Sequence, residues 1–268
     1  YEGVTLKGKG SVGLITYLRT DSTRISEEAD ASCREYIAQQ YGEQFVGDKT
    51  AVKSSKTGKI QDAHEAIRPT DSSLSPAMLK EQLPRDLFRL YQLIWTRFLA
   101  SRMAEAVYET TSVKIGAGDY RFNVAASKVK FDGFMTVYSY DSEKSTMNAA
   151  MKKITKDTEI TLSGLDPQQH FTQPPAHFTE ASLVKTLEEL GIGRPSTYAP
   201  TITTLLARRY IVKESKNLYI TELGEAVNDM MEDGFPTIVD VNFTANMESL
   251  LDGVEEGKVK WKTIVENF

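Results

Sequence analysis

The sequence predicts an α+β protein that is mainly helical, with a small antiparallel β segment between two helical regions. Three observations support this fold class. Apolar residues recur at helical spacing through residues 1–103, alternate with polar residues through 104–171, and return to helical spacing through 172–268. A hydrophobic content of 40% is enough for real cores in a chain of 268 residues. We therefore expect three domains with these boundaries.

The first region carries the start and stop signals of several helices. Ser26 followed by two acids is a typical helix start, and Gly42 is a suitable end. Ser75-Pro76 begins another helix, with proline at its first position. After Pro84, a strong apolar stripe predicts a core-facing helix. The stripe consists of Leu87, Leu90, Tyr91, Ile94, Phe98 and Leu99.

The second region has the two-residue period of β-strands. Residues 111–115 and 120–124 alternate between apolar and polar, and Gly116-Ala117-Gly118 permits a tight turn between them, so we expect a β-hairpin. Further strands are predicted at Phe131–Phe134, at Val137–Tyr140 and around Ile160 and Leu162.

The third region has the element order of a winged-helix (CAP-like) domain. The expected elements are a helix from Thr179 to Gly191, a helix starting at Pro195 or Ser196, strands at Tyr210–Val212 and Leu218–Ile220, and a helix capped by Thr221. Helix, turn, helix and β-wing together predict a DNA-binding shape.

The charge distribution leaves nucleic-acid binding open. A net charge of −5 argues mildly against it, but phosphate contacts depend on where the cations lie. Between Gly191 and Lys213 the charged side chains are all basic, namely Arg194, Arg208, Arg209 and Lys213. A locally basic face on an acidic protein is therefore expected.

Cysteine content and hydropathy limit the cellular compartments in which the protein is expected. Cys33 is the only cysteine, which excludes an intrachain disulfide and a cysteine-rich zinc site and favours a reducing cytoplasm. No apolar run approaches the roughly 20 residues of a membrane span, and no signal peptide opens the chain. Because the chain begins at Tyr1 without an initiator methionine, we expect a piece of a longer polypeptide.

The segment Gly13-Leu14-Ile15-Thr16-Tyr17-Leu18-Arg19-Thr20-Asp21-Ser22 is the strongest chemical signal. A phenol is a poor nucleophile while protonated, and a nearby cation favours its ionised form. The same guanidinium can hold a phosphate by two parallel hydrogen bonds. Tyr17 beside Arg19 is thus suited to phosphoryl transfer through a phosphotyrosine. A tyrosine near an arginine is common, however, so the pair alone does not identify a catalytic site.

The whole decamer resembles the active-site pattern G-x-I-T-Y-x-R-T-D-S of the type IA DNA topoisomerases. Two further segments match in the same order, namely Asp62-Ala63-His64-Glu65-Ala66-Ile67-Arg68-Pro69-Thr70 and Gly191-Ile192-Gly193-Arg194-Pro195-Ser196-Thr197-Tyr198-Ala199. The resemblance covers essentially the whole chain. Leu18, after the tyrosine, is more similar to bacterial topoisomerase I than to topoisomerase III or reverse gyrase.

The resemblance implies a mechanism and a set of site residues. Tyr17 is implied to attack a DNA phosphodiester, leaving a 5′-phosphotyrosyl link and a free 3′-hydroxyl, with religation that needs no ATP and relaxation of negatively supercoiled DNA. Arg19 is implied to hold the scissile phosphate. The implied DNA-binding residues, chiefly for single strands, are Arg19, Asp21, His64, Arg68, Arg194, Ser196, Thr197 and Tyr198.

Structural alternatives stay open for most of these residues. Thr20, Asp21 and Ser22 suit a turn before the Ser26 helix, although Asp21 could orient Arg19. Arg68 could brace its loop, and Tyr198 could belong to a core. Residues 194–197 suit either an ordinary interhelical turn or an anion site at a helix N-terminus.

Parts of the resembled enzymes have no counterpart in this sequence. No acidic cluster matches the Toprim domain that holds Mg²⁺, and Cys33 cannot build a zinc ribbon. No second histidine or cysteine lies at ligand spacing from His64, so no metal site is predicted. The resemblance thus implies a central part of the enzyme toroid, with a β arch, unable to relax DNA alone and located in the cytoplasm with the nucleoid.

Two other classes of function remain. A non-enzymatic winged-helix regulator would place the helix near Arg208 and Arg209 in a duplex major groove. A scaffold that binds no nucleic acid would fit the acidic net charge. The Tyr17 decamer favours the enzyme, because neither alternative needs it.

Overall fold

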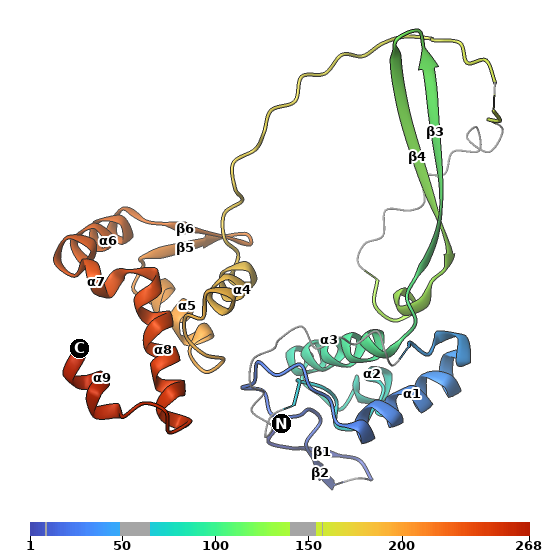
Figure 1. Cartoon of the computed structure of the whole chain (residues 1–268). Helices are drawn as coiled ribbons and strands as arrows, with labels where there is room; N and C mark the ends of the chain where they lie inside the picture. The colour runs from blue at the N-terminus through green and yellow to red at the C-terminus, as the bar shows by residue number, and fades with distance from the viewer. Residues whose placement is uncertain (9, 49–64, 140–153, 157) are drawn as a thin grey trace. The chain divides into compact units, whose positions relative to one another are not determined.

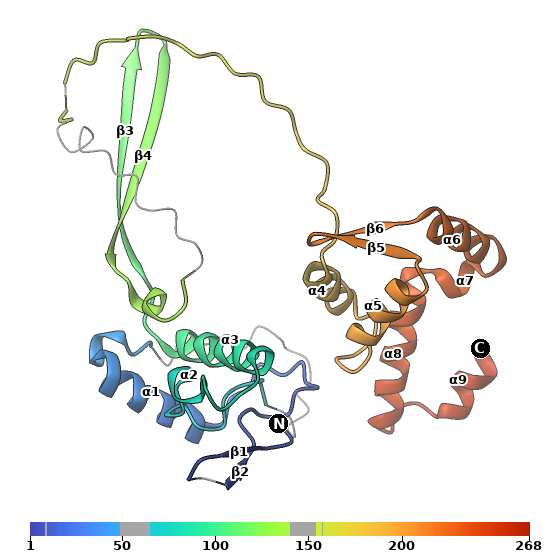
Figure 2. The same cartoon turned by 180° about the vertical axis from the view of Figure 1, so that it is seen from behind.

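The structure is a computed structural model that describes residues 1–8, 10–48, 65–139, 154–156 and 158–268. It divides into two compact units, Tyr1–Leu165 and Asp166–Phe268, each described by itself. The fold is α+β and mainly helical with small antiparallel sheets, as predicted (Figures 1 and 2). The predicted division into three domains at 103/104 and 171/172 stays a prediction.

Helices α1 (Glu27–Tyr41), α2 (Pro76–Leu79) and α3 (Arg85–Arg102) build the core of the first unit, with the short 3-10 helix η1 (Glu43–Phe45) after α1. The predicted start of α1 is confirmed, because the Ser26 hydroxyl accepts a hydrogen bond from the Ala29 amide at 3.3 Å. Most of the core side chains come from these helices and from the segment before α2. They include Cys33, Ile37, Leu74, Leu79, Tyr91, Trp95, Phe98 and Leu99.

Two aromatic side chains of α3 fasten the segment that precedes α2. The Tyr91 hydroxyl donates to the Leu74 carbonyl at 2.6 Å, and the Trp95 indole donates to the Ser72 carbonyl at 3.0 Å. Buried aromatic groups with satisfied polar tips fix both packing and orientation. Residues 72–74 are thereby held in place shortly after the segment Arg68-Pro69-Thr70.

A buried ionic cluster joins α1 to α3. Asp30 accepts from Arg34 at 2.7 Å and from Arg102 at 3.0 Å, and the Arg34 guanidinium also donates to the Gly47 carbonyl. Burial by itself raises the pKa of Asp30, but the hydrogen bonds and charges of the two arginines lower it overall. The carboxylate therefore stays charged and pairs with two nearly buried cations.

Cys33 is expected to resist thiol reagents in the folded protein. Its side chain is fully buried, and burial raises the pKa of the thiol to about 11. The reactive thiolate is therefore both rare and shielded. Native protein should react with a disulfide reagent at mildly alkaline pH only as fast as the first unit opens, whereas urea-unfolded protein should react at once. Equal rates in both states would contradict this packing.

Two hairpins complete the first unit. The short strands β1 (Val4–Leu6) and β2 (Gly10–Val12) pair antiparallel, an element that the sequence did not predict. The predicted hairpin is confirmed but longer, with β3 (Val107–Ala117) and β4 (Tyr120–Phe131) paired along their lengths. Gly118 has φ +60° in its two-residue loop, a conformation that glycine adopts without strain. Figure 1 shows β3 and β4 as a long two-stranded ribbon.

The further strands predicted after β4 are wrong. Gly133–Thr136 is a 3-10 helix, η3, in which the Phe134 amide donates to the Ala104 carbonyl at 2.9 Å. The extended run ends at Phe131, because Asp132 already has a helical backbone conformation. Residues 137–139 form no strand, and Tyr140 lies outside the described residues. Ile160 and Leu162 are exposed and pair with no described strand. Alternation without a partner strand does not make a sheet.

The second unit contains helices α4 (Glu180–Leu190), α5 (Tyr198–Ala207), α6 (Glu222–Gly234), α7 (Pro236–Val239), α8 (Val241–Glu255) and α9 (Trp261–Asn267), with strands β5 (Ile211–Glu214) and β6 (Asn217–Ile220). The predicted caps of α4 and α6 are confirmed, since Thr179 accepts from the Ser182 amide at 3.1 Å and Thr221 accepts from Gly224 at 3.0 Å. The predicted β5–β6 hairpin is confirmed.

The predicted start of α5 at Pro195 or Ser196 is wrong, because the helix begins at Tyr198. The interpretation of this region as a winged helix stays a prediction. Among the described helices, none combines the length and the apolar character needed to cross a bilayer.

Candidate functional site

The tyrosine segment and the Arg68-Pro69-Thr70 segment are hydrogen-bonded to each other. The Thr16 amide donates to the Arg68 carbonyl, and the Thr70 amide donates to the Leu14 carbonyl, both at 3.0 Å. Between these bonds, Ile15 and Pro69 form an antiparallel bridge. Two sequence motifs about 50 residues apart thus form one short ladder, directly before Tyr17.

The hydroxyl of Thr16 reinforces this ladder from the side. It donates to the Ala66 carbonyl at 2.8 Å and accepts from the Arg68 amide at 3.0 Å. The Thr70 hydroxyl donates in turn to the Gly13 carbonyl at 2.6 Å. Sequence analysis gave no role to either threonine, although both lie within the matched motifs. Their distance in sequence hid the pairing.

Tyr17 lies at the surface. Its side chain is 40% exposed, and its ring packs edge-on against the Tyr1 ring with centroids 5.3 Å apart. Gly13 permits the close approach of the Tyr1 backbone, since a Cβ at position 13 would lie 3.1 Å from the Tyr1 carbonyl oxygen. The ladder fixes the backbone before Tyr17, and the exposed ring remains accessible to a substrate.

Arg19 is exposed two residues later, and it makes no ion pair or hydrogen bond within the described parts of the chain. Its guanidinium can therefore bind an anion without breaking a described contact. Asp21 is likewise exposed and makes no described contact with Arg19, so nothing in the structure supports its orienting that arginine.

Thr20 and Ser22 make local turn contacts. The Thr20 hydroxyl accepts from the Ser22 amide at 3.0 Å, and the Ser22 hydroxyl accepts from the Arg24 amide at 3.2 Å. These are the side chain-to-backbone bonds of turn residues. The geometry favours the structural interpretation of both.

The Arg68 side chain makes its contacts within its own loop. Its guanidinium pairs with Glu65 through two nitrogens, at 2.8 Å and 2.7 Å, and donates to the Pro69 carbonyl at 3.1 Å. The side chain is only 14% exposed. This favours a bracing role, and a DNA contact by Arg68 stays a prediction. His64 lies outside the described residues.

In the second unit, glycines shape the loop between α4 and α5. Gly191 (φ +71°) and Gly193 (φ +80°) are both left-handed. A Cβ at Gly193 would lie 2.8 Å from the Thr197 hydroxyl, which itself accepts from the Arg194 amide at 2.9 Å. Any other residue at 193 would be strained and crowded. The same Cβ would also lie 3.4 Å from the Tyr198 ring.

The late start of α5 alters the predicted anion site. The amides of Thr197 and Tyr198 donate to the Arg194 carbonyl at 2.8 Å and 3.3 Å, forming a turn before the helix. Arg194 and Ser196 therefore precede the helix, and Thr197 is its N-cap residue. Part of the free backbone donor capacity that an anion would use is thus consumed by the turn.

The Arg194 guanidinium is paired with two acids of α8. One nitrogen contacts both Asp252 oxygens, at 2.8 Å and 2.9 Å, and lies 3.4 Å from Glu248. Another nitrogen donates to the Gly193 carbonyl at 3.1 Å. Burial lowers the pKa of Arg194, but the Asp252 hydrogen bond and both acids raise it overall. The sequence did not predict these partners, which are one helical turn apart on α8.

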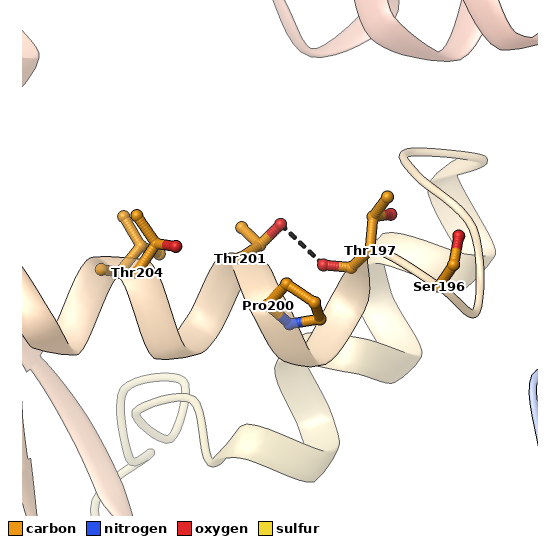
Figure 3. A pocket seen from close by; sticks show the side chains of 6 residues that line it. Ser196, Thr197, Pro200, Thr201 and Thr204 are labelled. Carbon is orange, nitrogen blue, oxygen red and sulfur yellow. Dashed lines mark hydrogen bonds between the residues drawn. The ribbon is translucent and has the colours of Figure 1, made fainter.

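An open groove runs along one side of α5. It has a volume of about 320 Å³ and is lined by Ser196, Thr197, Pro200, Thr201, Thr204 and Leu205. Figure 3 shows Ser196, Thr197, Pro200, Thr201 and Thr204 along this side of the helix. The Thr201 hydroxyl donates to the Thr197 carbonyl at 2.8 Å. The groove is open to solvent, and its exposed lining is mostly apolar, with hydroxyl groups as a minor part.

The described residues do not supply a metal site. In residues 1–8, 10–48, 65–139, 154–156 and 158–268, no three His, Cys, Asp or Glu side chains gather as ligands. The Mg²⁺ implied by the resemblance, whose ligands are expected outside this chain, stays a prediction.

Comparisons with known proteins agree with the motifs. A family model described as DNA topoisomerase matches residues 1–266. Among solved structures, full-length topoisomerase I from Thermotoga maritima is 37% identical, with a TM-score of 0.77. That alignment covers 100% of this chain and 43% of the Thermotoga maritima chain.

Proposed function

This chain belongs to the DNA topoisomerase family, and from that premise we propose that it carries the nucleophile of a type IA enzyme, which cuts one DNA strand and rejoins it. The main observation in support is the exposed Tyr17 on a backbone that Arg68-Pro69-Thr70 holds by hydrogen bonds. An accessible phenol on a fixed backbone, with an uncommitted cation nearby, suits attack on a phosphodiester.

The proposed step balances as a transesterification. The Tyr17 oxygen loses its proton and forms a bond to phosphorus, while the bond from phosphorus to the 3′ oxygen breaks and that oxygen gains a proton. The product is a 5′-phosphotyrosyl link and a free 3′-hydroxyl. Because one phosphodiester replaces another, religation needs no ATP. Arg19 stabilises the negative charge that gathers on the phosphate in the transition state.

Single-stranded DNA is the proposed substrate of the second unit. The α4–α5 loop and the open side of α5 present the exposed side chains of Ser196 and Thr197. The adjacent segment has basic residues without acids up to Lys213. Hydroxyls and cations suit the backbone of a strand, and Tyr198 could stack on a base. The winged-helix regulator is not favoured, because it leaves the Tyr17 segment without a role.

We propose that the whole activity needs more polypeptide than this chain, including a Toprim domain that holds Mg²⁺. The chain spans 43% of the length of the Thermotoga maritima relative, which leaves room for such a domain. The isolated chain would then bind single strands without relaxing negatively supercoiled DNA. In a cell, the complete enzyme would work on the nucleoid in the cytoplasm.

Arg19→Ala is expected to slow strand cleavage by about 10²–10³-fold, because one transition-state donor is lost. The assay supplies a family Toprim domain in trans, with Mg²⁺ and labelled single-stranded DNA, and measures the rate of covalent capture. Binding of the same strand should weaken far less. Arg89→Ala removes an exposed arginine of α3 and should change neither quantity. Equal losses in cleavage and binding would refute a transition-state role, and absence of any adduct from the unmodified protein would reject the proposed function.

A further inference from the structure

The ion pairs of Arg194 place a net negative charge where a DNA phosphate is expected to bind. One guanidinium faces two carboxylates, so the formal charge of the trio of Arg194, Glu248 and Asp252 is −1. A phosphate that approaches this trio meets repulsion as well as attraction. A contact between Arg194 and DNA therefore requires one carboxylate to move.

The two acids differ in how easily they can leave. The Asp252 side chain is 60% exposed and bonds directly to the guanidinium, whereas the Glu248 side chain is 23% exposed and lies at 3.4 Å. An exposed ion pair contributes little net stability, because water solvates the separated charges well. Asp252 is thus the exchangeable partner, and Glu248 remains near the guanidinium when Asp252 departs.

We propose that the Asp252 carboxylate takes the place of a DNA phosphate in the DNA-free protein. It forms an ion pair with Arg194 there, and a phosphate of the bound single strand displaces it. Carboxylate and phosphate oxygens accept hydrogen bonds from the same guanidinium N–H groups, so one can replace the other. Asp252 then lowers the affinity for single strands, because binding must first break its pair with Arg194. This inference rests on the proposed single-strand contact of Arg194.

The test measures binding of a labelled oligothymidylate to the 268-residue chain across a salt series. Asp252→Asn should tighten binding about two- to five-fold, the range that an exposed ion pair allows. It should also steepen the slope of log affinity against log salt by up to about 0.7, because no freed Asp252 carboxylate then takes up a cation to offset the one that the phosphate releases. Glu255→Gln removes the same charge from α8 at an exposed residue with no ion pair among the described residues, and should change binding clearly less.

Arg194→Ala, alone and combined with Asp252→Asn, completes a double-mutant cycle for this pair. It should weaken binding and abolish the gain from Asp252→Asn, since the released guanidinium is then absent. If Arg194→Ala weakens binding but Asp252→Asn does not tighten it, or tightens it equally without Arg194, the exchange is overturned while the proposed function stands. If the unmodified chain binds no single strand, or Arg194→Ala has no effect, the DNA contact itself fails and the exchange fails with it.

Discussion

Tyr17→Phe is expected to abolish covalent capture of DNA while leaving single-strand binding nearly unchanged. Phenylalanine keeps the ring that packs 5.3 Å from Tyr1 but has no oxygen to bond to phosphorus. The loss should therefore be complete, unlike the partial loss at Arg19. The measurement is the yield of protein–DNA adduct on a denaturing gel, after complementation with a Toprim domain and Mg²⁺.

Tyr1→Phe is the matched control for this prediction. Tyr1 is an exposed tyrosine in direct contact with Tyr17, so it meets the same DNA and the same reagents. Its substitution should leave the adduct yield intact. An adduct that survives in Tyr17→Phe and disappears in Tyr1→Phe would identify Tyr1 as the nucleophile instead.

Asp30→Ala is expected to destabilise the first unit by about 3–5 kcal/mol, because it leaves two buried guanidiniums without their carboxylate. Arg34 and Arg102 are 9% and 10% exposed, so water cannot replace Asp30. Urea unfolding monitored by the reaction of Cys33 reports on this unit, since the thiol lies one turn further along α1. Glu35→Ala, at an exposed acid of the same helix, should cost far less. Equal losses in both variants would contradict the role of the cluster.

The same cluster predicts the sign of a pH effect. The pKa of Asp30 is lower in the folded than in the unfolded chain, so its contribution is fully present at neutral pH. It is lost as the pH falls below the usual aspartate range, near pH 4, and passes the folded pKa. Asp30→Asn should remove this part of the acid dependence of stability. An unchanged acid profile in Asp30→Asn would show that other groups govern it.

The helices could be predicted because their ends are local. Ser26, Thr179 and Thr221 cap their helices through bonds that span only three residues, and Gly191 ends α4 in a left-handed conformation. Strands depend on partners, which a local pattern does not contain. The alternation at Ile160 and Leu162 therefore led to a wrong strand prediction. Strands of three residues such as β1 are too short to show a detectable pattern.

In the candidate site, too, features that are local in sequence could be predicted and contacts between distant residues could not. Tyr17 and Arg19 are two residues apart, so the linear motif identified both. The contacts that hold or compete with site residues are distant in sequence, with 52 positions between the Arg68 amide and the Thr16 hydroxyl and 58 between Arg194 and Asp252. Only the folded chain reveals that Arg194 already has acidic partners, whereas Arg68 pairs with Glu65, three residues before it.

Identification of the DNA-linked residue in the trapped adduct tests the central claim most directly. The adduct would be digested with nuclease and protease, and the modified peptide sequenced by mass spectrometry. A nucleotide joined through its 5′-phosphate to Tyr17 is the predicted result. A nucleotide on Tyr1, on another side chain, or joined through a 3′-phosphate would contradict the account.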